Sequence, residues 1–128
     1  MSMKTLPEGA SQHVTAGPYS PVLRVQAGQM VVISGQAAIV ADGSVVGQTI
    51  EEQARLTLEN CAAQLRCGGA ELKDVFKVNV YMRDLAEWPR FNVVYAAMMP
   101  KPYPVRTAVQ AVLLPGLMIE IDMWAMVP

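Results

Sequence analysis

Residues 75–82 read VFKVNVYM, and this stretch decides the fold class. Its side chains alternate in character, and the apolar ones, which face one way, are Phe76, Val78, Val80 and Met82. The residues between them are polar or amphipathic. Alternation with a period of two predicts a half-buried β-strand that packs one face on a core.

An amphipathic helix is predicted before this strand, over residues 50–65. Apolar side chains recur there at helical spacing, at Ile50, Ala54, Leu58, Cys61 and Leu65. Thr49, followed three residues later by Glu52, fits a capping box at the start of the helix. The pair Gly68-Gly69 fits its end.

A second helix is predicted after the strand. Asp84 is suited to cap the element, and Pro89 fits a first helical turn, where a missing N–H costs little. The apolar stripe of this helix consists of Phe91, Val94, Tyr95 and Met98. Pro100 and Pro102 then stop it.

The remaining apolar runs predict further strands. They cover residues 22–25, 29–39, 105–112 and 118–126, with a weakly signalled strand near 4–6. Ala27-Gly28 predicts a hairpin between the first two of these runs. The order is then β-β-β-α-β-α-β-β. It predicts an α+β fold, a single mixed sheet with both helices on one face, in one domain of residues 1–128.

The composition argues against several classes of function. Of 128 residues, 52% are hydrophobic and 16% charged, and the formal net charge is −1. Lys and Arg are scattered singly, whereas a nucleic-acid binder needs a clustered basic face. The apolar excess predicts self-association. Because the first residues lack an apolar signal core and no apolar run approaches a membrane span, we expect a cytoplasmic protein with no membrane partner.

Residues that bind metals or act as nucleophiles are sparse. Cys61 and Cys67 lie six residues apart in a helical pattern, on different faces and too far apart for a disulfide. The only histidine is His13, so the sequence predicts no metal-ligand cluster and no Cys-His or Ser-His-Asp site. We expect two packing thiols, no metal and no cofactor.

Two charged residues stand out on predicted strands. Arg106 follows Pro104 at a strand mouth, and Glu120 lies between two isoleucines. A guanidinium can hold a small carboxylate through two hydrogen bonds, and a carboxylate can take or position a proton. A structural Arg–Glu pair is the alternative. In a plain hairpin turning near Pro115, Glu120 would face Gln110, which leaves it roughly 13 Å from Arg106.

Four other positions are candidates for the same site. Gly35, next to Ser34 at the end of a buried strand, allows a ligand close to the backbone, or is an ordinary bulge glycine. Tyr19, held among prolines, has a stiff backbone that can aim its phenol, or is a packing residue. Asn92 lies off the apolar stripe of its helix, either as a surface amide or as a hydrogen-bonding group in a site.

Five segments in order resemble the reactive intermediate deaminase family (Rid, formerly YjgF), over about residues 17–125. They are Gly17-Pro18-Tyr19-Ser20-Pro21, Ser34-Gly35-Gln36, Phe91-Asn92-Val93-Val94-Tyr95, Pro104-Val105-Arg106, and Leu114-Pro115 with Ile119-Glu120-Ile121. The resemblance implies a chorismate mutase-like fold and a homotrimer whose sheets form a central barrel. It also implies sites between subunits and a hydrolase activity without cofactor. Such deaminases convert enamines and imines released by pyridoxal phosphate enzymes, such as 2-aminoacrylate, to 2-keto acids and ammonia.

The resemblance also implies roles for individual residues. Arg106 would clamp the substrate carboxylate, and Glu120 would orient or deprotonate the attacking water. The remaining members of the implied pocket are Tyr19, Ser34, Asn92 and the backbone of Gly35 and Ala108. Ala108 stands where the best-known members commonly have Cys, so a thiol role is absent. The segment from 95 to 106 and the turn at 114–115 are also shorter here, which changes the rim of the pocket.

Three other functions stay open. A bulkier unsaturated amino acid, such as 2-aminomuconate, is an alternative substrate. A trimer that binds small carboxylates as a regulator is a non-enzymatic alternative. Family members have also been described as translation inhibitors or ribonucleases, which the scattered basic residues and the lack of a histidine pair disfavour. The presence of both Arg106 and Glu120 favours an enzyme.

Overall fold

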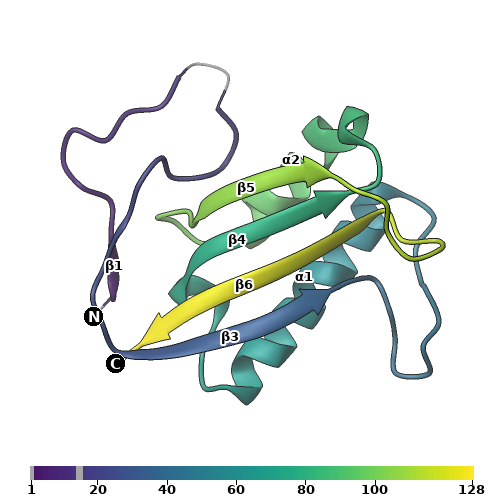
Figure 1. Cartoon of the computed structure of the whole chain (residues 1–128), viewed down its shortest axis with the longest axis horizontal. Coiled ribbons are helices and arrows are strands. Elements are labelled where there is room, and N and C mark those ends of the chain that lie inside the picture. Colours follow the sequence, from purple (N-terminus) through teal and green to yellow (C-terminus); the bar gives the residue numbers. More distant parts are fainter. Residues whose placement is uncertain (1, 14–15) are drawn as a thin grey trace.

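The computed structural model describes residues 2–13 and 16–128, and Figure 1 shows a sheet with two helices behind it. The strands of the sheet are β3 (Gln29–Gln36), β4 (Val75–Met82), β5 (Val105–Gln110) and β6 (Ile119–Val127). The helices are α1 (Ile50–Cys67) and α2 (Trp88–Met98). Both cover the same face of the sheet, which confirms the predicted α+β class.

The strand order is β3-β6-β4-β5, so β4 lies between β5 and β6. β5 pairs parallel with β4, and β6 pairs antiparallel with both β4 and β3. The last two strands therefore do not form the plain hairpin that the turn near Pro115 predicted. Gln110 and Ile119 both lie opposite Met82 of the intervening strand.

Two short strands stand outside this sheet. β1 (Lys4–Thr5) and β2 (Arg24–Val25) pair with each other in a separate two-stranded sheet. The hairpin predicted at Ala27-Gly28 is wrong, because β3 pairs with β6 instead of β2. A Cβ at Gly28 would collide with the backbone carbonyl of Val127. The close approach of two backbones is thus what this glycine permits.

The helix starts largely follow the predicted capping. Thr49 accepts a hydrogen bond from the Glu52 backbone at 3.2 Å, whereas the Glu52 carboxylate accepts from the Gln48 backbone at 2.8 Å. A short 3₁₀ turn, η2 (Leu85–Glu87), precedes α2 and is capped by Asp84. A similar turn, η1 (Leu72–Asp74), leads into β4.

The sequence predicted the wrong face for Phe76, at the beginning of β4. A bulge between Val75 and Lys77 breaks the register with β6. Val75 and Val78 consequently both enter the core, and Phe76 instead makes an edge-to-face contact with Trp124, with ring centroids 6.4 Å apart. A single unpaired residue changes the face of every side chain on one side of it, and alternation alone cannot reveal where that residue lies.

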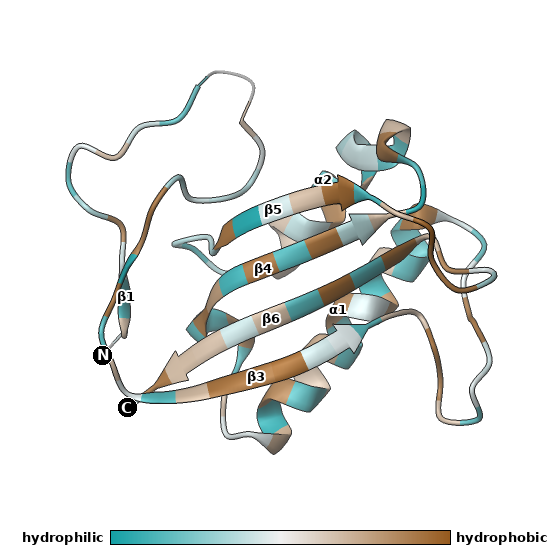
Figure 2. Cartoon of the chain, in the orientation of Figure 1, coloured by the Kyte–Doolittle hydropathy of each residue, from teal (hydrophilic) through white to brown (hydrophobic). Residues whose placement is uncertain are grey.

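The face of the sheet opposite the helices, called the open face here, carries large apolar side chains. Figure 2 shows a hydrophobic band in the middle of β3. Val31 and Ile33 of this band pack on the core, while Met30 and Val32 stay 51% and 56% exposed. Trp124, opposite Val32, is 42% exposed. Among the described residues, neither helix is long and apolar enough to cross a bilayer.

Candidate active site

Arg106 lies on the helix side of the sheet. It pairs with Val78, whose side chain is in the core beneath the helices, so the guanidinium extends under α2. The side chain is buried, with 8% of the residue exposed. Pro104 stands just before the strand and accepts a hydrogen bond from the Ser20 backbone at 3.1 Å. This bond ties the N-terminal loop to the strand mouth.

Four aromatic rings surround the guanidinium. The distances from its Cζ to the ring centroids are 4.4 Å for Trp88, 4.5 Å for Tyr95, 5.4 Å for Tyr19 and 5.9 Å for Phe91. Each lies within the range of cation–π attraction. We call this group of four residues the aromatic cage. Burial lowers the pKa of Arg106 below its ordinary value, but a guanidinium keeps its charge at any physiological pH.

The guanidinium lacks the hydrogen bonds that a buried cation normally makes. Neither Nη1 nor Nη2 of Arg106 has a partner among the described residues, although both atoms are buried. The side-chain oxygen of Asn92 is likewise buried without a hydrogen-bond partner among the described residues. Leaving a buried charged donor unpaired costs folding free energy, and a bound carboxylate would supply two acceptors in the matching geometry.

Gly17 brings the N-terminal loop against this cluster. A Cβ at Gly17 would lie 3.1 Å from Nη2 of Arg106 and 3.2 Å from Nδ2 of Asn92, so only a bare backbone fits without displacing a neighbour. Tyr19 follows two residues later and forms one wall of the aromatic cage. The structure thus brings together three predicted site residues, Tyr19, Asn92 and Arg106, from the loop, α2 and β5.

A buried lysine anchors the start of the same loop. Nζ of Lys4 donates to the carbonyl of Val75 at 2.6 Å and to that of Pro102 at 2.8 Å. Burial lowers the pKa of Lys4 to about 8. Both carbonyls adjoin the four-stranded sheet, one at the start of β4 and one just before β5. The loop that carries Gly17 and Tyr19 is therefore held at both ends.

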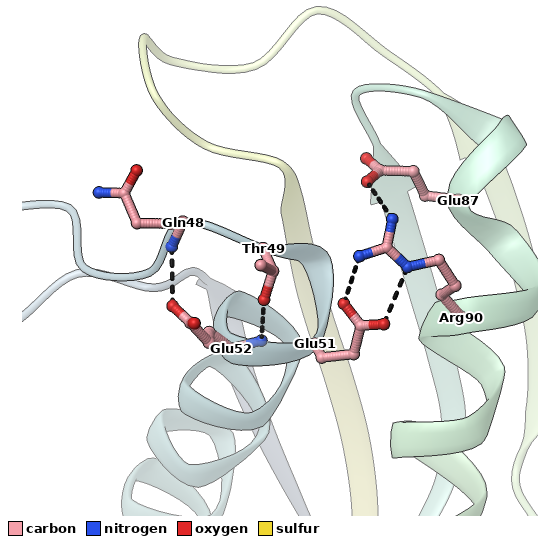
Figure 3. Close-up of polar contacts among 6 residues, drawn as sticks. All are labelled: Gln48, Thr49, Glu51, Glu52, Glu87 and Arg90. Carbon is pink, nitrogen blue, oxygen red and sulfur yellow. Dashed lines mark hydrogen bonds and ion pairs between the residues drawn. The ribbon is translucent and has the colours of Figure 1, made fainter.

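The first turn of α2, which carries Trp88 and Phe91, is fixed to α1 by a charged clamp (Figure 3). Arg90 donates two hydrogen bonds to the Glu51 carboxylate, at 2.8 and 2.6 Å, and lies 3.5 Å from Glu87. The hydrogen bonds from Arg90 lower the pKa of Glu51. Two parallel bonds fix orientation as well as distance, so the clamp joins the first turn of α2, which carries two of the cage residues, to the start of α1.

Glu120 lies on the open face, in a different group of residues. It pairs with Tyr81 of β4 and lines a groove of about 470 Å³ with Tyr81 and residues 111–114. A Cβ at Gly35 would collide with the Oε2 atom of Glu120 and would lie 3.0 Å from its Cδ. Ser34 and Gly35 sit in a register shift of β3, between Ile33 and Gln36, so the carboxylate folds over the bare backbone of this bulge.

A polar network adjoins Glu120 on the same face. Asp122 accepts hydrogen bonds from Asn79 at 3.0 Å and from the hydroxyl of Tyr81 at 3.3 Å. The negative charge of Asp122 raises the pKa of Tyr81. The sequence analysis did not name Tyr81 as a site residue. A signal for it was present, since the alternation of β4 predicts that Tyr81 faces away from the core.

Within one chain, the Arg106 group and the Glu120 group do not meet. Arg106 extends to the helix side and Glu120 to the open face. Across the sheet, Arg106 aligns with Met123 through Val78, three residues along β6 from Glu120. Two strand spacings and three residues place their Cα atoms roughly 14 Å apart. The predicted separation was close to this value, but the hairpin from which it was argued is wrong.

Ala108 and two residues that sequence reasoning missed form a small pocket beside Arg106. Ala108 lies opposite Val80 and therefore points to the same side of β5 as Arg106. With Leu85 and Trp88 it lines a pocket of about 280 Å³. Trp88 directly precedes Pro89 at the start of α2, and no sequence pattern showed that its ring covers Arg106.

The chain offers little for metal or thiol chemistry in the part that the structure describes. No group of three or more His, Cys, Asp or Glu residues there could hold a metal ion. Cys61 is a buried free thiol, and burial raises its pKa to about 12. Cys67 is a free thiol at the exposed end of α1.

These features define an α+β domain with a buried, aromatic-caged cation beside one edge strand. Residues 10–127 match the family model described as Endoribonuclease L-PSP, and the chain belongs to this family, which is the YjgF/Rid family. The resemblance seen in the five sequence segments is thereby confirmed.

Relatives match most of the chain. Protein mmf2, mitochondrial, from Schizosaccharomyces pombe is 41% identical over 124 residues, or 94% of this chain and 96% of that protein. A 2-iminobutanoate/2-iminopropanoate deaminase from Dermatophagoides farinae is 34% identical over 108 residues, 83% of each protein. RidA from an Antarctic Psychrobacter has a TM-score of 0.72 at 33% identity, over 92% of this chain and 94% of that one. The names support a deaminase at the level of the family and do not confirm a cytoplasmic location.

Proposed function

We propose that the protein is a cofactor-independent hydrolytic deaminase of reactive enamines and imines. It would convert 2-aminoacrylate-like substrates to 2-keto acids and ammonia. The observation that carries the proposal is the guanidinium of Arg106, buried inside four aromatic rings, with neither terminal nitrogen bonded to any residue that the structure describes. A small carboxylate is the group that such a guanidinium binds best. Substrates of this class present a carboxylate next to the C=N carbon.

The chemistry requires positioning and one proton shuttle. Arg106 holds the carboxylate, which places the adjacent imine carbon for attack. Glu120 takes a proton from water as its oxygen adds to that carbon, and the electron pair of the C=N bond moves to nitrogen. From a protonated imine this addition gives a carbinolamine, and Glu120 returns the proton to its nitrogen. Ammonia then leaves with the C–N electron pair, and the hydroxyl releases its proton to Glu120 as the C=O bond of the keto acid forms. An imine carbon is already electrophilic, so positioning and one proton shuttle through Glu120 suffice for these steps.

Because the two groups of residues are roughly 14 Å apart on opposite sides of one sheet, we propose that each site combines two copies of the chain. One copy supplies Arg106, Asn92 and Tyr19. The next supplies Glu120 and the Ser34-Gly35 backbone. A homotrimer that buries the open face would bring such groups together, and the exposed Met30, Val32 and Trp124 supply apolar surface for that contact.

A coupled assay tests the proposed activity. A dehydratase generates the enamine in situ, and ammonia or 2-keto acid is followed with and without the protein. We expect acceleration by the wild type and losses of at least about 100-fold in Arg106→Lys and Glu120→Gln, since each removes a transition-state contact. Arg55→Lys and Glu59→Gln, exposed on α1, are matched controls expected to behave as the wild type. No acceleration by folded wild-type protein would refute the proposal.

A small-carboxylate-binding regulator is the second candidate, because the same caged guanidinium would serve it equally well. This reading predicts binding of 2-oxo acids that depends on Arg106 but no turnover of any imine. Within the enzymatic reading, 2-aminomuconate stays an alternative substrate. We keep the cytoplasm as a proposed location.

A further inference from the structure

The apolar pocket beside Arg106 has a shape that bears on which imines the site takes. Its wall is Trp88, whose ring also covers the guanidinium at 4.4 Å, so pocket and carboxylate clamp share a side chain. Its floor is Ala108, two residues along β5 from Arg106 on the same side of the strand. Two residues of strand are roughly 7 Å, which is about the reach from the α-carbon of a linear chain of three to five carbons or of the seven-carbon benzyl group.

The chemistry of the lining restricts what can enter. Leu85 and Ala108 contribute apolar side chains, and Trp88 adds a large apolar ring with a single N–H donor. Arg90, two residues after Trp88, is paired with Glu51 and Glu87. The amide oxygen of Gln110 accepts from the backbone of Leu85 at 3.0 Å. A charged substituent placed here would lose its hydration without gaining a partner, whereas an apolar one would be removed from water.

We propose that Leu85, Trp88 and Ala108 bind the substrate side chain and select imino acids with apolar chains of about three to seven carbons over alanine-derived or acidic ones. This inference rests on the proposed function, because it places the substrate carboxylate on Arg106. It ranks larger apolar imines above the alanine-derived imine, the tautomer of 2-aminoacrylate, which stays a slower substrate of the same site. The methyl group of Ala108 leaves the floor open, and a larger residue there would close it. Each methylene buried in the pocket raises kcat/KM by about fourfold.

The test compares imines of alanine, leucine, phenylalanine and glutamate, made in situ by amino-acid oxidases. For the wild type we expect kcat/KM for the leucine imine to exceed that for the alanine imine by at least about tenfold, with the glutamate imine lowest. Ala108→Leu fills the floor and should bring the leucine-to-alanine ratio to one or below. Ala97→Leu, on the exposed side of α2, is the matched control and should keep the wild-type ratio.

Calorimetry with the matching 2-oxo acids separates this inference from the proposed function. Pyruvate, 4-methyl-2-oxopentanoate and 2-oxoglutarate are titrated into the wild type and Ala108→Leu. A wild-type preference for 4-methyl-2-oxopentanoate that Ala108→Leu abolishes supports the pocket even if no imine is turned over, in which case only the deaminase proposal fails. Turnover or binding with no side-chain preference, or with a preference that Ala108→Leu leaves intact, overturns the pocket.

Discussion

Replacing Gly35 by alanine should separate activity from stability. Gly35 is not among the positive-φ glycines, so alanine fits the backbone and should gain about 0.5–1 kcal/mol over glycine within a strand. The new Cβ would collide with Oε2 of Glu120 and lie 3.0 Å from Cδ and 3.2 Å from Cγ. Since carbon contacts settle near 3.5–4.0 Å, the carboxylate must retreat by roughly 1 Å.

This retreat displaces the Glu120 carboxylate but should change the stability of the fold very little. A carboxylate at the end of a flexible, part-exposed side chain can swing aside for about 0.5–1.5 kcal/mol. This offsets the alanine gain, so the free energy of unfolding should change by less than about 1 kcal/mol. A 1 Å displacement of a group that shuttles a proton can lower the rate about 100-fold. Gly35→Ala should therefore melt like the wild type and turn over about one hundredth as fast.

Thermal melts and kcat/KM on the same preparations check this prediction. Gly68→Ala is the contrasting control, because its Cβ would meet Val31 in the core and should lower stability while sparing turnover below the melting temperature. In a Glu120→Ala background the collision is gone, and Gly35→Ala should raise stability. Turnover of Gly35→Ala within threefold of the wild type would show that the observed position of the Glu120 carboxylate is not used.

Three further predictions concern pH, assembly and ligand binding. Because the pKa of Lys4 falls to about 8 in the folded chain from an ordinary 10.5, the unfolded chain binds more protons between these values, so stability should rise with pH in that window. Lys4→Met should lack this rise when the difference in melting temperature from the wild type is followed against pH. Light scattering should report three times 13.9 kDa, and Trp124→Glu on the open face should give a monomer without activity; an active monomer would contradict the two-copy site. Small 2-oxo acids at a hundredfold excess over Kd should stabilise the wild type by about 2.7 kcal/mol, and their neutral amides should not; equal melting shifts from acids and amides would exclude a carboxylate clamp at Arg106.

Local patterns predicted those parts of the fold that depend on neighbours in sequence. The apolar stripe of residues 50–65 and the alternation of 75–82 identified α1 and β4, because helical and extended periodicity are properties of consecutive residues. Local patterns could not predict which strands pair, because pairing depends on contacts between residues far apart in the chain. The turn near Pro115 looks like a hairpin turn, yet β4 takes the place between β5 and β6.

The candidate site shows the same limit. Tyr19, Asn92 and Arg106 come together, as the resemblance to the family implied, whereas the local pattern around each residue left its role open. The alternation of Ile119, Glu120 and Ile121 indicates that Glu120 faces away from the core. That Arg106 lies on the core side follows from the pairing of β5 with β4, which no local pattern contains. Trp88 was overlooked because an aromatic residue beside a proline reads as packing until its contact with Arg106 is seen.

Mixing two inactive variants tests the central claim most directly. If each site takes Arg106 from one copy and Glu120 from the next, coexpressed Arg106→Lys and Glu120→Gln chains form some interfaces in which both residues are wild type. With equal amounts and random assembly, about one quarter of the sites are intact, so the mixed oligomer should hydrolyse an in-situ imine at about a quarter of the wild-type rate. Activity no higher than the mean of the two separate variants would contradict a site that is shared between copies and built on these two residues.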